Sequence, residues 1–181
     1  AHAEREVLRM ADIALDMLNK SLDMFRDEDP DLEKSIRARD DRVDLLNREI
    51  SMFLTQHMEG ATGDSLQQMV RLITFTSDLE AAADVIDNNL LDLAKKKHTL
   101  RVEFSKEGWK DLEELYSAVT HVASLSISCF QRQDKDLAAK VVFHKRSIRK
   151  LEKRMRESHI ERLVQRRQES INTSSIHLDV L

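Results

Sequence analysis

The amino-acid sequence repeats its own pattern of apolar and capping residues at a single offset of 105 positions. Apolar residues recur at helical spacing in both halves and match at this offset: Val7 with Leu112, Met10 with Leu115, Leu22 with Ile127, Phe25 with Phe130, Val43 with Ile148, Leu46 with Leu151, and Ile50 with Met155. The helix-capping residue Asp29 falls on Asp134 in the same way. Because one offset relates stripes and caps without an insertion, the sequence predicts two copies of one helical unit.

The composition favours long helices in both copies. The 181 residues include three glycines and one proline, while charged residues make up 34% and aromatic residues 4%. So few turn-forming residues leave little material for loops. We therefore expect an all-α helical bundle of two tandem three-helix units, residues 1–98 and 99–181, with the last helix truncated at Leu181.

Start and stop signals divide each unit into three helices. Asp29 is expected to cap the second helix, with Pro30 in its first turn, where no amide hydrogen is needed. Phe104 and Trp109 are placed to form a hydrophobic staple at the fourth helix, which accounts for the only tryptophan without a binding role. The first three expected helices cover residues 4–25, residues 30–58, and residues from Asp64 or Ser65 to 97. The next three are expected to begin after Ser105, after Asp134, and near Ser170 or Asn172.

A row of acidic residues accompanies the apolar stripe of the third helix. The stripe is predicted to consist of Leu79, Ala82, Ala83, Ile86, Leu90 and Leu93. Glu80, Asp84 and Asp87 follow at spacings of four and three, so they share one helical face. Like charges at this spacing repel, and the row therefore needs a cation, a basic partner or solvent to relieve it. A plain solvated acidic edge is one interpretation.

A second acidic row favours a metal site instead. Asp40 and Asp44 lie one turn apart beside the stripe of the second helix. Helices joined by a short turn run antiparallel and side by side, so Asp40, Asp44, Glu80 and Asp84 are predicted to meet, with Asp41 and Asp87 as further candidates. Carboxylate oxygens are ligands for hard divalent or ferric ions, so iron, manganese or magnesium is the expected occupant, with zinc also considered.

The second copy repeats the scaffold without the acidic row. At the offset of 105 positions, Asp40 becomes Lys145, Asp44 becomes Arg149 and Asn47 becomes Glu152. One metal site at most is therefore expected in the chain. No Glu-x-x-His pair, HExxH, CxxC or phosphate-binding glycine loop is present, and no nucleophile has a base nearby, so the protein is expected not to be an enzyme.

The remaining polar residues are expected to be structural. The single cysteine, Cys129, lies among apolar residues and is predicted to be a buried, inert thiol. The histidines are scattered and are each expected to be exposed or at the edge of the core rather than ligands: His57, His98, His121, His144, His159 and His177. No stretch approaches 18 uninterrupted apolar residues, so the chain is expected to be soluble.

Charge is distributed unevenly along the chain. Residues 1–98 carry 13 basic and 21 acidic side chains, whereas residues 99–181 carry 16 and 12. Residues 145–167 hold ten lysines or arginines and three acids, which is compatible with a solvated face or with a phosphate, lipid head-group or nucleic-acid surface. No aromatic residue follows Phe143, and no nucleic-acid partner is expected because single-stranded nucleic acid is bound by aromatic stacking.

Several segments resemble the PhoU family, whose members consist of tandem three-helix bundles with paired acidic motifs. The acidic pair resembles those motifs in Asp40-Asp41-x-x-Asp44 and in Glu80-x-x-x-Asp84. The second half is similar to the PhoU-type domain of bacterial sodium/phosphate cotransporters. The segments that carry this likeness are Phe104-Ser105-x-Glu107-Gly108-Trp109, His159-x-x-Arg162-Leu163, and the run from Glu169 to Asp179.

The resemblance implies a regulatory rather than a catalytic role. It implies a domain on the cytoplasmic side of the inner membrane, attached to the transmembrane phosphate transporter portion of the same chain and regulating sodium-dependent phosphate uptake. The metal cluster of the family would map onto Asp40, Asp44, Glu80 and Asp84. A homo-oligomer is also expected, through the exposed core of the last helix. The alternatives are a stand-alone PhoU-type signalling adaptor and a helical scaffold without metal.

Overall fold

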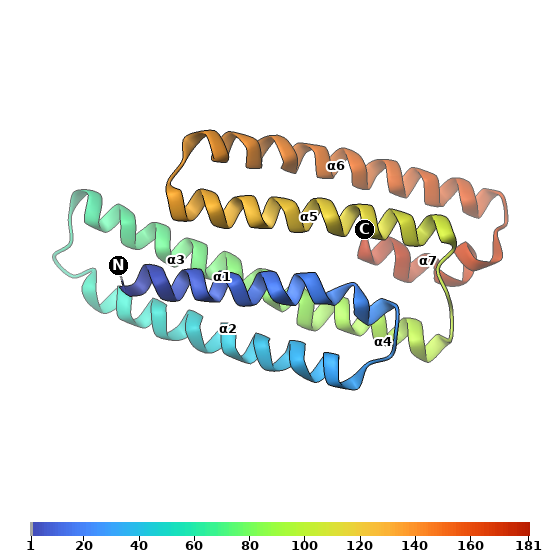
Figure 1. The fold of residues 1–181 in the computed structure, drawn as a ribbon, viewed down its shortest axis with the longest axis horizontal. Helices are drawn as coiled ribbons and strands as arrows, with labels where there is room; N and C mark the ends of the chain where they lie inside the picture. The colour runs from blue at the N-terminus through green and yellow to red at the C-terminus, as the bar shows by residue number, and fades with distance from the viewer. Residues whose placement is uncertain (1) are drawn as a thin grey trace. The chain divides into compact units, whose positions relative to one another are not determined.

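The computed structural model describes residues 2–181, and all of its regular structure is helical (Figure 1). The all-α prediction is confirmed. The elements in chain order are α1 (His2–Ser21), the 3-10 turn η1 (Asp23–Phe25), α2 (Pro30–His57), α3 (Gly63–Asp84), the π-helical turn η2 (Val85–Leu90), α4 (Leu91–Leu100), α5 (Lys106–Arg132), α6 (Lys135–Val164) and α7 (Gln168–Val180). Among the described residues, no helix is both long and apolar enough to span a bilayer.

The chain divides into two compact units. The first contains residues 2–21 and 29–89, and the second contains residues 22–28 and 90–181. The expected division after His98 differs from this one because α4 packs against η1 and α7 and so joins the second unit.

The first unit is a bundle of α1, α2 and α3, in which every pair of helices is in contact (Figure 1). Its core contains the residues predicted from helical spacing, among them Val7, Met10 and Met17 from α1 and Ile36 and Val43 from α2, none of which is exposed to solvent. Burial of such side chains, each contributing roughly 1.5–3 kcal/mol, is what holds the three helices together.

The second unit is built on the antiparallel pair α5 and α6, against which α7 packs. Ser105 caps α5, because its hydroxyl accepts a hydrogen bond from the Gly108 amide. The rings of Phe104 and Trp109 meet edge to face with centroids 5.4 Å apart, as expected of the predicted staple. Phe104 also contacts Phe25, which closes the core at this end of the unit.

The internal repeat is visible in the geometry of both units. The Asp29 carboxylate accepts hydrogen bonds from the amides of Asp31 and Leu32, and the Asp134 carboxylate accepts the two equivalent bonds from Asp136 and Leu137. The two caps are therefore the same structure at an offset of 105 residues.

A side-chain contact between α1 and α2 has a counterpart between α5 and α6 at the same offset, although the residue types differ. An ion pair joins Asp16 and Arg39 at 2.6 Å in the first unit. At the equivalent positions of the second unit, the rings of His121 and His144 meet edge to face with centroids 5.2 Å apart. The offset thus relates spatial neighbours as well as sequence patterns.

The π-helical turn η2 shifts the register predicted for the third helix. A π turn adds one residue to a helical turn, so the buried stripe advances from Leu79, Ala83 and Ile86 to Leu91 and Ala94. The predicted stripe members Leu90 and Leu93 are only half-buried, and Ala82 is exposed. The prediction was wrong for Leu90 and Leu93 because a uniform period of 3.6 residues was assumed. It was also wrong for Ala82, which lies before η2.

Several helix boundaries also differ from those predicted. Helix α1 ends at Ser21 and is followed by the separate turn η1, rather than continuing to Phe25. The third helix begins at Gly63 after Thr62, without a side-chain hydrogen bond from either proposed cap, Asp64 or Ser65. The last helix begins at Gln168, two residues before the predicted start, and Arg167 precedes it without a side-chain cap.

Candidate functional site

Three carboxylates from α2 and α3 meet within the first unit. Asp40 and Asp44 lie one turn apart on α2, and Asp84 is the last residue of α3. One carboxylate oxygen from each of the three lies within 4.8 Å of the others. No other group of three or more histidine, cysteine or acidic residues among residues 2–181 is arranged in this way. Three of the four predicted ligands are therefore brought together.

Asp40 is the innermost carboxylate of this group. Its residue is only 9% exposed, and its Oδ1 atom is buried without a hydrogen-bond partner in the described chain. Burial, together with the charges of Asp87, Asp44, Asp84 and Asp41, raises the pKa of Asp40 to about 6. The acids therefore repel one another, and the buried oxygen needs a positive or hydrogen-donating partner.

Glu80 and Asp41 lie at the edge of this group. Glu80 is one turn before Asp84 on α3 and is half-buried. Burial and then the charges of Asp84 and Asp44 raise the pKa of Glu80, so it shares the field of the three acids without belonging to the close group. Asp41 is exposed and affects Asp40 only through its charge.

Asp87 closes the inner end of the acidic group and has a basic partner. The π-helical turn places it on the buried face of η2, where its residue is 7% exposed. The guanidinium of Arg37 on α2 donates hydrogen bonds to both of its carboxylate oxygens, at 3.0 and 3.2 Å. Asp87 is therefore paired with Arg37, and it does not belong to the close group of three carboxylates.

The three close carboxylates fit a hard cation. A cation bound among them would offset their mutual repulsion and would supply the missing partner of Asp40 Oδ1. The donor set consists only of oxygen atoms, which suits magnesium, manganese or iron better than metals that prefer sulfur ligands. Asp40, Asp44 and Asp84 would hold such an ion, and solvent would complete its coordination because Asp84 is exposed.

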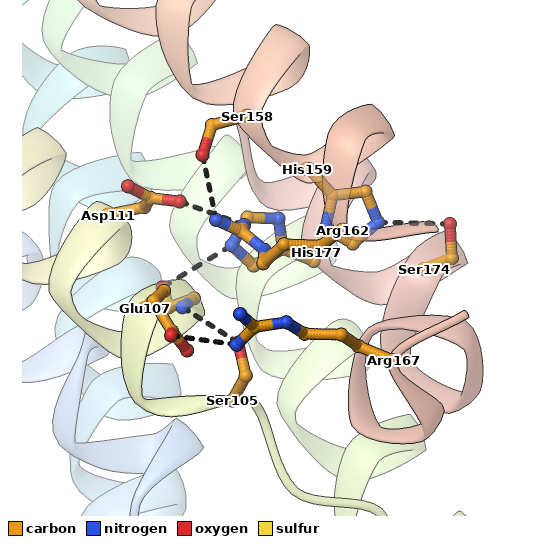
Figure 2. Close-up of polar contacts among 10 residues, drawn as sticks. Ser105, Glu107, Asp111, Ser158, His159, Arg162, Arg167, Ser174 and His177 are labelled. Atoms are coloured by element: carbon orange, nitrogen blue, oxygen red, sulfur yellow. Dashed lines mark hydrogen bonds and ion pairs between the residues drawn. The ribbon is translucent and has the colours of Figure 1, made fainter. Parts of the chain in front are cut away.

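A second polar cluster lies in the core of the other unit, where the guanidinium of Arg162 on α6 is 7% exposed (Figure 2). Arg162 donates a hydrogen bond at 2.9 Å to Asp111 on α5 and another to the hydroxyl of Ser158. On the same edge, Arg167 pairs with Glu107 at 2.8 Å. These contacts connect the beginning of α5 with the end of α6.

Two histidines stack beside Arg162. The rings of His159 on α6 and His177 on α7 are 4.6 Å apart and 14° from parallel, and both residues are 1% exposed. His177 Nε2 donates a hydrogen bond to the Gly108 carbonyl oxygen, and His159 Nε2 lies 3.1 Å from the Ser174 hydroxyl (Figure 2). Gly108 lies directly against the His177 ring, since a Cβ atom there would be in van der Waals contact with it at 3.4 Å.

Both histidines are neutral in this environment. Burial, followed by the charges of His159, Arg162 and Arg156, lowers the pKa of His177 to about 4. Burial and the charge of Arg162 likewise lower the pKa of His159. The cluster therefore anchors α7 to α5 and α6 as long as neither ring takes up a proton.

The expectation that His159 and His177 lie at a surface or core edge was wrong. Ser170, Thr173 and His177 recur at spacings of three and four, and all three are buried. The spacing of this buried polar stripe on α7 is visible in the sequence. Buried helix faces were predicted from apolar residues alone, and a polar stripe was therefore not recognised as buried. Cys129 is half-buried rather than fully buried, and its thiol lies 3.5 Å from the Asp134 carbonyl oxygen.

Comparison with known proteins finds a family match over most of the first unit. Residues 7–91 match the family described as the PhoU domain. The chain is 31% identical over 182 residues to YjbB of Salmonella typhimurium, and 30% identical to YjbB of Escherichia coli strain K12, both named for inorganic phosphate export. These alignments cover the whole chain but only 33% of the length of each relative.

A shorter relative is covered more fully. The chain is 26% identical over 172 residues to the phosphate-specific transport system accessory protein PhoU homolog 1 of Thermotoga maritima. This alignment includes 90% of the chain and 72% of that relative. No solved structure matches the chain.

Proposed function

We propose that the chain, whose residues 7–91 match the PhoU domain family, is a non-enzymatic regulatory module of phosphate transport. The relatives named above are associated by name with phosphate export or with phosphate-specific transport. In this proposal the module senses or relays a signal by binding.

The observation that carries the proposal is the close approach of Asp40, Asp44 and Asp84 in the first unit. We propose that these residues bind one divalent or ferric ion, with iron, manganese, magnesium and zinc as the candidates. Glu80 and Asp41 would lie around this ion as outer acidic groups. An ion shared by α2 and α3 would couple the packing of these helices to metal availability, which gives the module a means of regulation.

Two modes of action are supported by different relatives. The chain spans a third of each YjbB sequence, and these relatives are named for inorganic phosphate export. In the first mode that we propose, the chain is a domain that works together with a membrane-embedded transporter portion of the same protein, on its cytoplasmic side. A sodium-coupled phosphate symporter is the specific form of this proposal. The Thermotoga PhoU homolog, of which 72% is covered, favours instead a separate adaptor that binds a phosphate transport system.

Phosphate transport in cells tests the proposal. Wild-type protein and Asp44→Asn/Asp84→Asn would be produced, within the full-length protein, in cells lacking the native gene, and radioactive phosphate uptake and release would be measured. We expect the double variant to alter net phosphate flux, whereas Asp92→Asn, at an exposed acid of α4, leaves it unchanged. Deletion of the gene without any effect on phosphate flux or on phosphate-dependent gene expression would contradict the proposed function.

A dependence on sodium separates the two modes. If the chain regulates a sodium-coupled transporter, the flux that changes with Asp44→Asn/Asp84→Asn disappears when sodium is replaced by choline. If it acts as an adaptor of another transport system, the changed flux persists without sodium and requires that system's own genes.

A further inference from the structure

Residues 137–151 of α6 carry positive charge without any acidic residue. Residues 137–151 include five lysines and arginines and no aspartate or glutamate. The equivalent stretch of α2, residues 32–46, contains four basic and four acidic residues. Since both stretches occupy the same place in the repeated scaffold, the fold itself does not require a cationic helix here.

These charges gather on one face of the helix. Val142, Arg146, Arg149 and Lys153 follow one another at spacings of four and three, with Phe143 and Lys150 beside them. All six residues are exposed. The opposite face carries the stripe that packs toward α5, including Ile148, Leu151 and Met155. We call the exposed set of six residues the outer face of α6.

The basic residues of this face are not neutralised within the described chain. Ion pairs on α6 involve its second half, where Arg154 contacts Glu114 and Arg156 contacts Glu152. Lys153 reaches Glu157 only at 3.8 Å with both groups exposed, which is a weak pair. For Arg146, Arg149 and Lys150, no ion pair is formed with any of residues 2–181.

Two apolar side chains stand among these cations. Phe143 is 66% exposed and Val142 is 52% exposed, and the ring contact made by Phe143 is with His144, at 5.6 Å. At the equivalent positions of α2 the sequence has Ala38 and Arg37. An exposed phenylalanine in a cationic face is typical of helices that lie in a membrane interface, with the ring in the acyl boundary and the basic residues at the head groups.

From these observations we infer that the outer face of α6 docks on the surface of a bilayer that contains anionic lipid. The Lys and Arg side chains would contact head-group phosphates, and Phe143 and Val142 would enter the interface. A nucleic acid is less suited to this face, since it offers no apolar phase for the two side chains to enter. The inference rests on α6 alone and does not depend on the metal site or on the proposed regulation.

Vesicle sedimentation tests this inference with the full chain. We expect the protein to bind vesicles containing phosphatidylglycerol and not vesicles of phosphatidylcholine alone. Binding should weaken between 0.1 and 1 M salt, since the screening length falls from about 10 to 3 Å. Reversal of three charges in Arg146→Glu/Arg149→Glu/Lys150→Glu should weaken partitioning by about 100-fold or more, because three attractions to the anionic head groups become repulsions.

A matched triple variant controls for net charge. Lys34, Lys106 and Lys110 are exposed and lie outside the outer face, so Lys34→Glu/Lys106→Glu/Lys110→Glu changes the net charge equally. We expect this control to keep vesicle binding within a few-fold of wild type, and circular dichroism would establish that both variants are folded. Equal loss in both variants would overturn the inference, because binding would then follow overall charge.

A fluorescent reporter tests the docking without charge reversal. Trp109→Phe removes the only tryptophan, and Phe143→Trp then places the sole indole on the outer face. We expect its emission to shift to the blue and to be quenched by brominated lipid with phosphatidylglycerol vesicles only. An unshifted emission at saturating vesicles, absence of binding to anionic vesicles, or binding to duplex DNA or RNA but not to vesicles would overturn the inference.

Discussion

His159 and His177 stack in the core of the second unit with ring centroids 4.6 Å apart, although they come from different helices. The contact connects α6 to α7, and the His177 bond to the Gly108 carbonyl connects α7 to α5. Because Arg162 is adjacent, a proton on either ring would add a second positive charge to a buried site. The attachment of α7 therefore depends on the neutral state of both rings.

The first prediction concerns the pH dependence of stability. The pKa of His177 is lowered to about 4 in the folded protein from an ordinary value of 6.5, so the unfolded chain binds the proton more readily. The contribution of His177 is fully present above pH 6.5 and is lost as the pH falls toward 4. We expect urea unfolding to show a loss of about 2 kcal/mol from this residue between pH 7.5 and pH 5.

The variant His177→Gln separates this effect from other titrating groups. It is expected to lower stability at pH 7.5 and to show a shallower decline toward pH 5 than wild type. If His177→Gln shows the wild-type slope, then His177 does not contribute to the change in stability between pH 5 and pH 7.5.

The second prediction concerns the buried ion pair between Arg162 and Asp111, whose side chains are 7% and 18% exposed. Arg162→Leu leaves the Asp111 carboxylate without its partner in a largely buried position. We expect a loss of about 3–5 kcal/mol in the free energy of unfolding. Arg154→Leu removes the arginine of an exposed pair on the same helix and should cost less than about 1 kcal/mol. Equal losses in the two variants would contradict the difference in burial.

The third prediction concerns the repeated caps. Asp29→Ala and Asp134→Ala each remove a carboxylate that accepts two backbone amides. We expect both variants to lose about 1 kcal/mol, as is typical of such caps. Chemical unfolding of the two variants measures this. A loss at one cap only would indicate that the two units differ in how they use the repeated structure.

The fourth prediction concerns Asp40 in metal-free protein. Its pKa is raised to about 6, so its charged form destabilises the folded state, and the stability contributed by this group falls as the pH rises from about 4 to 6. Asp40→Asn is therefore expected to raise the stability of metal-free protein at pH 7.5 by about 1–3 kcal/mol. The same change should weaken stabilisation by added manganese. A less stable metal-free Asp40→Asn protein would indicate that the carboxylate has a favourable partner.

The helices and most of the core could be predicted because they depend on local spacing. Val7, Met10 and Val43 were placed by periodicity, and Asp29, Ser105 and Asp134 were placed as caps by side-chain chemistry alone. The position of Leu91 in the core could not be predicted in this way, because η2 inserts one residue into a helix whose sequence continues a regular pattern.

The acidic group could be predicted only in part. The pairing of Asp40 and Asp44 with Asp84 follows from two acidic rows on neighbouring helices. The bidentate contact of Asp87 with Arg37 depends on the rotation introduced by the π turn, and spacing does not reveal it. The hydrogen bond from His177 to the Gly108 carbonyl oxygen joins residues 69 positions apart, so no local pattern reveals it.

The central claim is that Asp40, Asp44 and Asp84 bind a cation, and calorimetric titration of metal into chelator-treated protein tests it most directly. Manganese, magnesium, iron and zinc would be titrated into wild type, Asp44→Asn/Asp84→Asn and Asp92→Asn. We predict saturable binding of at least one of these ions by wild type and Asp92→Asn, and its loss in the double variant. Absence of binding by wild type for all four ions, or unchanged binding by the double variant, would contradict the claim.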